Sequence, residues 1–199
     1  NLAPQNAPVD EQQRRAFGKK VRELYFGDRT PGRKAILEYS DLFSYKYFWH
    51  GIHRTLLSRA HHAPLAPTFL YRFDFDSKHF NIMRIITCGR KVRGTCHADD
   101  LSYLFYNAAA KKLKRRTAEF KTIKRLVSMV VHFAISGDPN IPMVCQDEKE
   151  QPRGAWLPIS KDDKVFQCLN ISHDVHVIDL PEAEKLRLWD CIYDRELLY

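Results

Sequence analysis

Residues 94–105 read Gly94-Thr95-Cys96-His97-Ala98-Asp99-Asp100-Leu101-Ser102-Tyr103-Leu104-Phe105 and predict a short loop that runs directly into an amphipathic helix. Asp99 and Asp100 fall in the first helical turn, where carboxylates are favoured by the positive end of the helix dipole. Apolar residues then recur at helical spacing and predict a helix packed on a core: Leu101, Leu104, Phe105 and Ala108. His97 is therefore held between a tight loop and a helix, where an imidazole can transfer protons or serve only as a structural hydrogen-bonding group.

The segment around His97 resembles the catalytic-histidine segment of the type-B carboxylesterases, the cholinesterase-like branch of the α/β-hydrolases, and in particular the insect α-esterases. Further segments resemble, in the right order, the strand before that histidine, the helix and turn after it, and the C-terminal segment of the family: residues 68–76, 120–123, 133–140, 156–159 and 169–171. The resemblance implies an α/β-hydrolase fold. Residues 1–199 would form the C-terminal portion of one such domain, with the last strands of a doubly wound, mostly parallel sheet and its flanking helices.

The resemblance further implies a carboxylesterase that hydrolyses small-molecule carboxylic esters through a Ser-His-Glu triad, with His97 as the general base and no cofactor. Asp100 stands where family members usually have a supporting glutamate, and its side chain is one methylene shorter. Asp99 is expected to lie at the surface. No Gly-x-Ser-x-Gly sequence occurs in the chain. The serine, the glutamate and the oxyanion-hole donors are therefore expected from the remainder of the same hydrolase domain, which acts as the chain's partner.

A second informative segment lies on a long helix predicted from about residue 33 to residue 60. Seven apolar side chains predict a broad buried face on this helix: Ile36, Leu37, Phe43, Tyr47, Phe48, Ile52 and Leu56. By periodicity alone, Tyr47 and Phe48 belong to the core. By resemblance, the two residues lie on a helix that lines the acyl and alcohol pockets, so they are also candidate substrate-binding residues, because apolar substrates need apolar walls.

The remaining pattern predicts alternating helices and strands. Helices are predicted over residues 10–26, 98–112, 117–136 and from 181 to about 198. Strands are predicted over 68–75 and, as a short strand, around 82–87, and a hairpin over 165–170 and 175–178. The predicted stripe of the helix at 117–136 includes Phe120, Ile123, Val127, Val130, Val131 and Ala134. Gly137 is expected to end that helix.

Composition limits the function further. The chain has 199 residues and a formal net charge of +8, much of it within residues 111–125. Phe120 is the one aromatic residue among these basic side chains, which is too few to stack on successive bases, so we expect a solvated rim and no nucleic-acid partner. No run of about twenty apolar residues could span a membrane. An inactive cholinesterase-like adhesion domain is the alternative function, and it would be expected to carry disulfides and a following membrane span.

The five cysteines form no clustered framework, which favours reduced thiols and an intracellular, cytoplasmic location. Cys96 adjoins His97, but adjacent side chains usually project in different directions, so Cys96 is not assigned as a nucleophile. His50 and His53 are three residues apart, as are His173 and His176, yet no further ligand repeats at a matching spacing. No metal site is therefore predicted.

Overall fold

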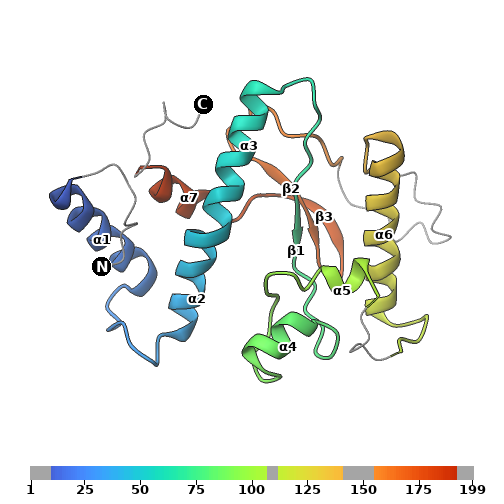
Figure 1. The fold of residues 1–199 in the computed structure, drawn as a ribbon, viewed down its shortest axis with the longest axis horizontal. Coiled ribbons are helices and arrows are strands. Elements are labelled where there is room, and N and C mark those ends of the chain that lie inside the picture. Colours follow the sequence, from blue (N-terminus) through green and yellow to red (C-terminus); the bar gives the residue numbers. More distant parts are fainter. Residues whose placement is uncertain (1–9, 107–111, 141–154, 192–199) are drawn as a thin grey trace. The chain divides into compact units, whose positions relative to one another are not determined.

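The computed structural model describes residues 10–106, 112–140 and 155–191, which form two compact units (Figure 1). The helical unit consists of Asn1–Thr68, Ser160–Phe166 and Leu180–Tyr199. The sheet unit consists of Phe69–Ile159 and Gln167–Asp179. The chain crosses between the units several times, so each unit is assembled from segments that are distant in the sequence.

The helical unit contains α1 (Glu11–Phe26), α2 (Ile36–Ser44), a π-helical turn η1 (Tyr45–Trp49), α3 (His50–His62) and α7 (Ala183–Asp190). The start of α1 is fixed by a capping box, in which the Asp10 side chain accepts from the backbone N–H of Gln13. Trp189 is fully buried and donates its indole N–H to the Tyr25 hydroxyl at 3.0 Å. This buried hydrogen bond joins α1 to α7 in the core of the helical unit.

The long helix predicted over residues 33–60 is present, but its buried face is a different one. Six of the seven predicted face residues are more than 40% exposed; they are Ile36, Leu37, Phe43, Tyr47, Phe48 and Ile52. Leu56 is buried as predicted, and the other buried positions are Leu42, Tyr45, His50, Arg54 and Ala60. The π-helical turn shifts the face that follows it, because each of its hydrogen bonds spans one extra residue. The exposure of Ile36, Leu37 and Phe43 does not follow from this turn, because these residues precede it.

The sheet unit is built on β1 (Tyr71–Phe73), β2 (Gln167–Ile171) and β3 (Val175–Asp179), in that spatial order. β1 pairs with β2 in parallel, and β2 pairs with β3 in the predicted antiparallel hairpin. Among its described residues, the unit also contains the helices α4 (Ile82–Cys88), α5 (Leu101–Leu104) and α6 (Ala118–Ser136). Gly137 ends α6 in the left-handed conformation, as predicted.

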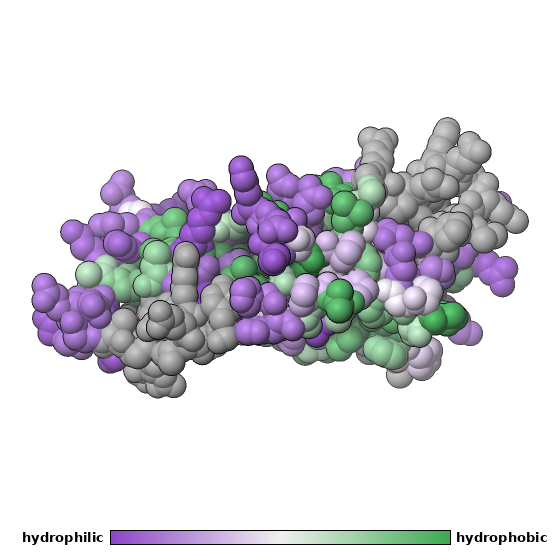
Figure 2. Space-filling model, turned by 90° about the horizontal axis from the view of Figure 1, so that it is seen from above, coloured by the Kyte–Doolittle hydropathy of each residue, from purple (hydrophilic) through white to green (hydrophobic). Residues whose placement is uncertain are grey.

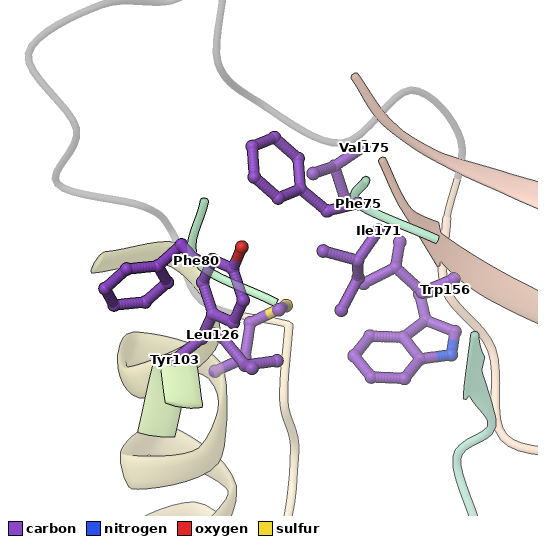
Figure 3. Close-up of a cluster of buried hydrophobic side chains, with 9 residues drawn as sticks. Phe75, Phe80, Tyr103, Leu126, Trp156, Ile171 and Val175 are labelled. Atoms are coloured by element: carbon purple, nitrogen blue, oxygen red, sulfur yellow. The ribbon is translucent and has the colours of Figure 1, made fainter. Parts of the chain in front are cut away.

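An apolar core fills the space between the sheet and the helices of this unit (Figure 3). Tyr103 is 1% exposed, and the rings of Phe73, Phe75 and Phe80 lie 5.0, 5.7 and 5.0 Å from its ring. Leu126 of α6 closes the same cluster, and Ile171 of β2 is fully buried in it. Tyr103 thus anchors the short helix that follows His97.

Three details of the sheet unit differ from the prediction. Residues 82–87 are helical, because the local preference of Ile82, Ile85 and Ile86 for strands is overridden by tertiary contacts. The helix after His97 ends at Leu104, and Phe105 is extended and 68% exposed, so Leu101 and Phe105 do not face the core. Ala108 lies outside the described residues.

On α6 the buried stripe consists of Thr122, Leu126 and Met129, whereas Val130 and Val131 are exposed. Other large apolar side chains of α6 are also exposed, including Phe133 and Ile135. Figure 2 shows apolar groups scattered among charged ones on one face of the molecule. Within the described parts of the chain, no helix combines the length and the apolarity needed to cross a membrane.

Candidate active site

His97 lies on a turn between α4 and α5, with its side chain exposed. The turn bends sharply at both ends. Gly94 has φ +107°, and Ala98, with φ +69°, is the one non-glycine residue with positive φ within the described ranges. A left-handed alanine costs about 1–2 kcal/mol. Such strain persists only where surrounding contacts fix the backbone, and the residues around His97 supply these contacts.

Asp99 provides the main contacts that hold this turn. Its carboxylate is fully buried, and Oδ2 accepts from the backbone N–H of Cys96 at 2.8 Å while Oδ1 accepts from that of Arg84 at 3.0 Å. The backbone N–H of Asp99 also donates to the Cys96 carbonyl at 3.1 Å. One side chain therefore closes the turn that carries His97 and ties it to the first turn of α4.

The prediction that Asp99 lies at the surface is wrong. Two adjacent aspartates at a helix start are typical of a solvated first turn, and the pattern does not reveal that Asp99 caps a different helix. The N-cap residue of α4, Asn81, makes no side-chain capping bond, so the free N–H of Arg84 is satisfied from the His97 turn instead. Because residues 82–87 were predicted as a strand, the prediction contained no helix N-terminus there for Asp99 to cap.

Asn81 connects the other end of the loop to the core. Its side chain is fully buried, and Nδ2 donates to the carbonyls of Phe75 at 3.0 Å and of Gly94 at 3.3 Å. Its Oδ1 accepts from the Tyr103 hydroxyl at 2.8 Å. Burial raises the pKa of Tyr103, so its hydroxyl stays protonated and remains a donor. Asn81 thus links Gly94, where the loop opens, to the anchor of α5.

The Arg84 side chain is also buried and supports the same loop. Its guanidinium donates to the carbonyl of Ser77 at 2.9 Å and to that of Val92. Sequence reasoning missed Asn81, Arg84 and Asp99 as a group. The available signal was the pair of polar residues Asn81 and Arg84 at the two ends of the first turn of residues 82–88. This pair indicates a buried polar network only if the segment is known to be a helix.

Asp100 occupies the N-cap position of α5, and its Oδ2 accepts from the Tyr71 hydroxyl of β1 at 2.9 Å. Burial raises the pKa of Tyr71, and the negative charge of Asp100 adds to this effect. Tyr71 is therefore a protonated donor. The hydrogen bond connects the helix after His97 to the sheet, while the supporting role of Asp100 in the triad stays a prediction.

Tyr47 and Phe48 belong to the helical unit, whereas His97 and Asp100 belong to the sheet unit. Both aromatic side chains lie on η1 and are exposed, Tyr47 by 63% and Phe48 by 43%. The ring of Tyr47 lies 5.7 Å from that of Phe43. We call the exposed apolar side chains of α2, η1 and α3 the aromatic face: Ile36, Leu37, Phe43, Tyr47, Phe48 and Ile52.

His50 and His53 converge on a carboxylate. His50 Nε2 lies 3.2 Å from Oδ1 of Asp190, His53 Nδ1 lies 3.4 Å from Oδ2, and Arg54 donates to Oδ1 at 3.2 Å. Burial would raise the pKa of Asp190, but the hydrogen bonds from His50, His53 and Arg54 hold it well below its usual value. Within residues 10–106, 112–140 and 155–191, no group of His, Cys, Asp and Glu could hold a metal ion.

The chain matches the model of the carboxylesterase family over residues 2–189. It is 36% identical over 197 residues to Esterase B1 of Culex pipiens, and the match covers 98% of this chain and 35% of that protein. It is 24% identical over 131 residues to the juvenile hormone esterase of Tribolium castaneum, covering 61% of this chain and 22% of that protein. The chain thus spans about a third or less of the length of these relatives.

Two solved structures share its fold. The juvenile hormone esterase of Manduca sexta, determined with OTFP covalently attached, aligns with a TM-score of 0.66 at 18% identity, covering 93% of this chain and 33% of that chain. A carboxylesterase of Geobacillus stearothermophilus aligns with a TM-score of 0.59 at 19% identity, covering 86% of this chain and 31% of that chain. The fold is therefore that of an α/β-hydrolase, and by its sequence the chain belongs to the carboxylesterase family.

Proposed function

We propose that this chain supplies His97 as the general base of a serine carboxylesterase with a Ser-His-Glu triad. The serine, the glutamate and the oxyanion-hole donors would come from the remainder of the same hydrolase domain. The observation that carries the proposal is the exposed His97 side chain on a strained turn whose backbone is fixed by the buried Asp99 carboxylate. A general base needs an accessible imidazole on a fixed backbone.

In the proposed reaction, His97 takes the proton of the serine hydroxyl as the oxygen attacks the ester carbonyl carbon. The imidazolium then gives this proton to the leaving alcohol, which leaves an acyl-enzyme. In the second half, His97 takes a proton from water, which attacks the acyl carbonyl, and returns it to the serine oxygen. Asp99 and Asp100 act on the position of His97 and take no part in bond making.

We further propose that Tyr47 and Phe48 form part of the wall against which the acyl or alcohol group of the substrate lies. Their exposure on the aromatic face supports this role, because a well-packed core residue would be covered within its own unit. Apolar walls favour esters of apolar acids, including xenobiotic and lipid esters. Sensitivity to organophosphates follows from the same resemblance to the insect α-esterases, since such compounds react with an activated serine.

A cytoplasmic location is also part of the proposal. It is supported by the cysteines, because the four that lie in the described ranges are free: Cys88, Cys96, Cys168 and Cys191. The adhesion alternative has no such support. The match to Esterase B1 extends over nearly the whole chain, and the chain keeps the histidine that an esterase needs.

The proposal is tested by covalent labelling of the complete protein with a serine-reactive fluorophosphonate. We expect the protein to be labelled and His97→Gln to lose nearly all of the labelling rate, because the serine then has no base. His79→Gln is the matched control, since His79 is an exposed histidine of the same unit. Equal labelling of the two variants, each folded by circular dichroism, would contradict the role of His97.

The pocket role is tested by Phe48→Ala on a series of p-nitrophenyl esters of increasing acyl length. We expect the preference among chain lengths to shift by about 1–3 kcal/mol in the specificity constant, because an apolar contact is lost for some substrates and not for others. Phe133→Ala is the control, because Phe133 is exposed to a similar extent on α6 of the sheet unit. An unchanged profile with a lower melting temperature would show that Phe48 is only a packing residue.

A further inference from the structure

Two cysteines bracket the loop that leads to His97. Cys88 is the last residue of α4, and Cys96 immediately precedes the histidine. The intervening residues, Gly-Arg-Lys-Val-Arg-Gly-Thr, are polar or basic apart from one valine and two glycines. The proposed ester hydrolysis uses neither thiol, so their proximity calls for a separate explanation.

The two sulfur atoms lie on either side of one hydroxyl group. Thr87 Oγ1 is 3.4 Å from Cys88 Sγ and 3.6 Å from Cys96 Sγ. Cys88 is exposed, and Cys96 is partly buried. Of the other cysteines in the described ranges, Cys168 is fully buried on β2 in the sheet unit, and Cys191 lies in the helical unit. Because both sulfur atoms are in contact with the same oxygen atom, the two thiols are near neighbours.

The backbone between the cysteines can adapt to a bond between their sulfur atoms mainly next to Cys88, because Arg84 and Asn81 hold the carbonyls of Val92 and Gly94 nearer to Cys96. Gly89 and Gly94 stand near the two ends of the loop with φ of +80° and +107°, and a Cβ at either position would meet nothing within 4 Å. Glycine residues in open surroundings move at low steric cost. A disulfide needs an Sγ–Sγ distance of about 2.05 Å and Cα atoms within about 7 Å, and an exposed loop with glycine at each end can reach this geometry.

We propose that Cys88 and Cys96 form a reversible disulfide when the protein meets a hydroperoxide such as hydrogen peroxide. The Cys88 thiolate attacks the peroxide, so that an S–O bond forms, the O–O bond breaks and hydroxide leaves; the sulfur is oxidised and the peroxide reduced. The Cys96 sulfur then attacks the sulfenic sulfur, so that the S–S bond forms and the S–O bond breaks. The leaving hydroxide takes the Cys96 proton, and two thiols and one hydrogen peroxide give one disulfide and two waters.

The assignment of the two roles follows from exposure. Cys88 can be reached by a small oxidant, whereas burial raises the pKa of the Cys96 thiol and makes it the poorer first nucleophile. Cys96 therefore acts as the resolving thiol, which needs only to meet the sulfenic acid that forms beside it.

The disulfide would act on His97 through the backbone. In the reduced protein the Cys96 thiol donates to the carbonyl oxygen of His97 at 3.4 Å. A disulfide sulfur has no proton to donate, and bond formation draws Cys96 toward the end of α4. Because Asp99 also holds the backbone N–H of Cys96, this movement disturbs the turn that fixes the histidine. This consequence rests on the proposed function of His97, whereas the formation of the disulfide does not.

Peptide mapping of the complete protein tests the chemistry without reference to activity. After treatment with hydrogen peroxide and blocking of the remaining thiols, trypsin should release residues 85–90 linked to residues 94–111, two hydrogens lighter than the separate peptides. Cys88→Ser should abolish the linked pair, while Cys191→Ser, which replaces an exposed cysteine of the helical unit, should retain it. Full alkylation of Cys96 after oxidation would overturn the proposal.

Turnover of a p-nitrophenyl ester then tests the link to His97. We expect oxidation to lower the turnover of the wild-type protein by about tenfold or more, dithiothreitol to restore it, and Cys88→Ser to remain active under the same treatment. A linked peptide pair with unchanged turnover would overturn the effect on His97. A linked pair in a protein that never hydrolyses esters would leave the disulfide in place and refute the proposed function instead.

Discussion

Two carboxylates, one in each unit, are held in opposite ways. Asp99 accepts from backbone N–H groups of Cys96 and Arg84 and so fixes the path of a loop. Asp190 accepts from side chains of α3, and so fixes the end of α7 against that helix. A carboxylate bound to the backbone controls local geometry to fractions of an ångström, whereas one bound by flexible side chains mainly contributes to stability. The first should matter for turnover and the second for folding.

Among the carboxylates and their hydrogen-bond partners, the largest effect is expected at Asp99. Asp99→Asn replaces one acceptor oxygen with an amide that faces a backbone donor, so the turn shifts and kcat falls by about 10²-fold, with KM little changed. Steady-state kinetics of the complete protein measure this split. Asp99→Glu, which keeps both acceptors on a longer side chain, should fall between the wild type and Asp99→Asn.

Asp174→Asn is the matched control for Asp99, because Asp174 is an exposed aspartate of the same unit. It should leave kcat unchanged. If Asp99→Asn lost stability while its folded fraction kept normal turnover, Asp99 would contribute only to stability, as Asp190 does. This result would contradict the proposed difference between the two carboxylates.

A medium effect is expected at Asp190, on stability. Asp190→Asn removes the charge on which His50, His53 and Arg54 converge, and the side chain is only 13% exposed. Hydrogen bonds to a charged group contribute about 1.5–3 kcal/mol, so the free energy of unfolding should fall by about this amount while kcat of the folded protein stays normal. Denaturant unfolding measures the first quantity, and Asp162→Asn, at an exposed site of the same unit, is the control.

The pH dependence of the Asp190 effect has a definite sign. The folded pKa of Asp190 lies below its ordinary value of 3.8, so the ionised carboxylate stabilises the fold. This contribution is fully present above that ordinary value and is lost as the pH falls through the folded pKa. The difference in unfolding free energy between wild type and Asp190→Asn should therefore be constant near neutrality and shrink below about pH 4. A difference that grew in acid would show the opposite linkage.

The smallest effect is expected at Tyr71, whose hydroxyl donates to Asp100 at 2.9 Å. Tyr71→Phe removes one hydrogen bond and should cost about 0.5–1.5 kcal/mol of stability, with a change in kcat of only a few-fold. Tyr106→Phe is the control, since Tyr106 is 94% exposed. If Tyr71→Phe lost as much kcat as Asp99→Asn, the result would show that Asp100, the partner of Tyr71, positions His97 directly.

The sequence predicted the elements that depend on local pattern. The hairpin around residues 172–174, the start of α1 after Asp10 and the end of α6 before Gly137 are all present. These features follow from turn, cap and alternation signals that act over a few residues. The family resemblance, carried by residues 94–105, also gave the fold class correctly.

The errors have two physical causes. One is the local π-helical turn at Tyr45–Trp49, which shifts the buried face of α3 and which no pattern within the helix signals. The other is contact between segments that are distant in the sequence. Residues 82–88 form a helix whose first turn is capped by Asp99, which is distant in the sequence. The polar network around the His97 turn could not be predicted for the same reason, since the hydrogen bonds of Asn81 to Gly94 and Tyr103, and of Arg84 to Asp99, join separate segments.

The most direct test of the account is the specificity constant of the complete protein for p-nitrophenyl butyrate, measured for the wild type, His97→Gln and His79→Gln. We expect the specificity constant of His97→Gln to fall by about 10⁴-fold or more, because the serine has lost its base, and that of His79→Gln to match the wild type. A His97→Gln protein that is folded and stays within about tenfold of the wild type would contradict the assignment of His97 as the general base.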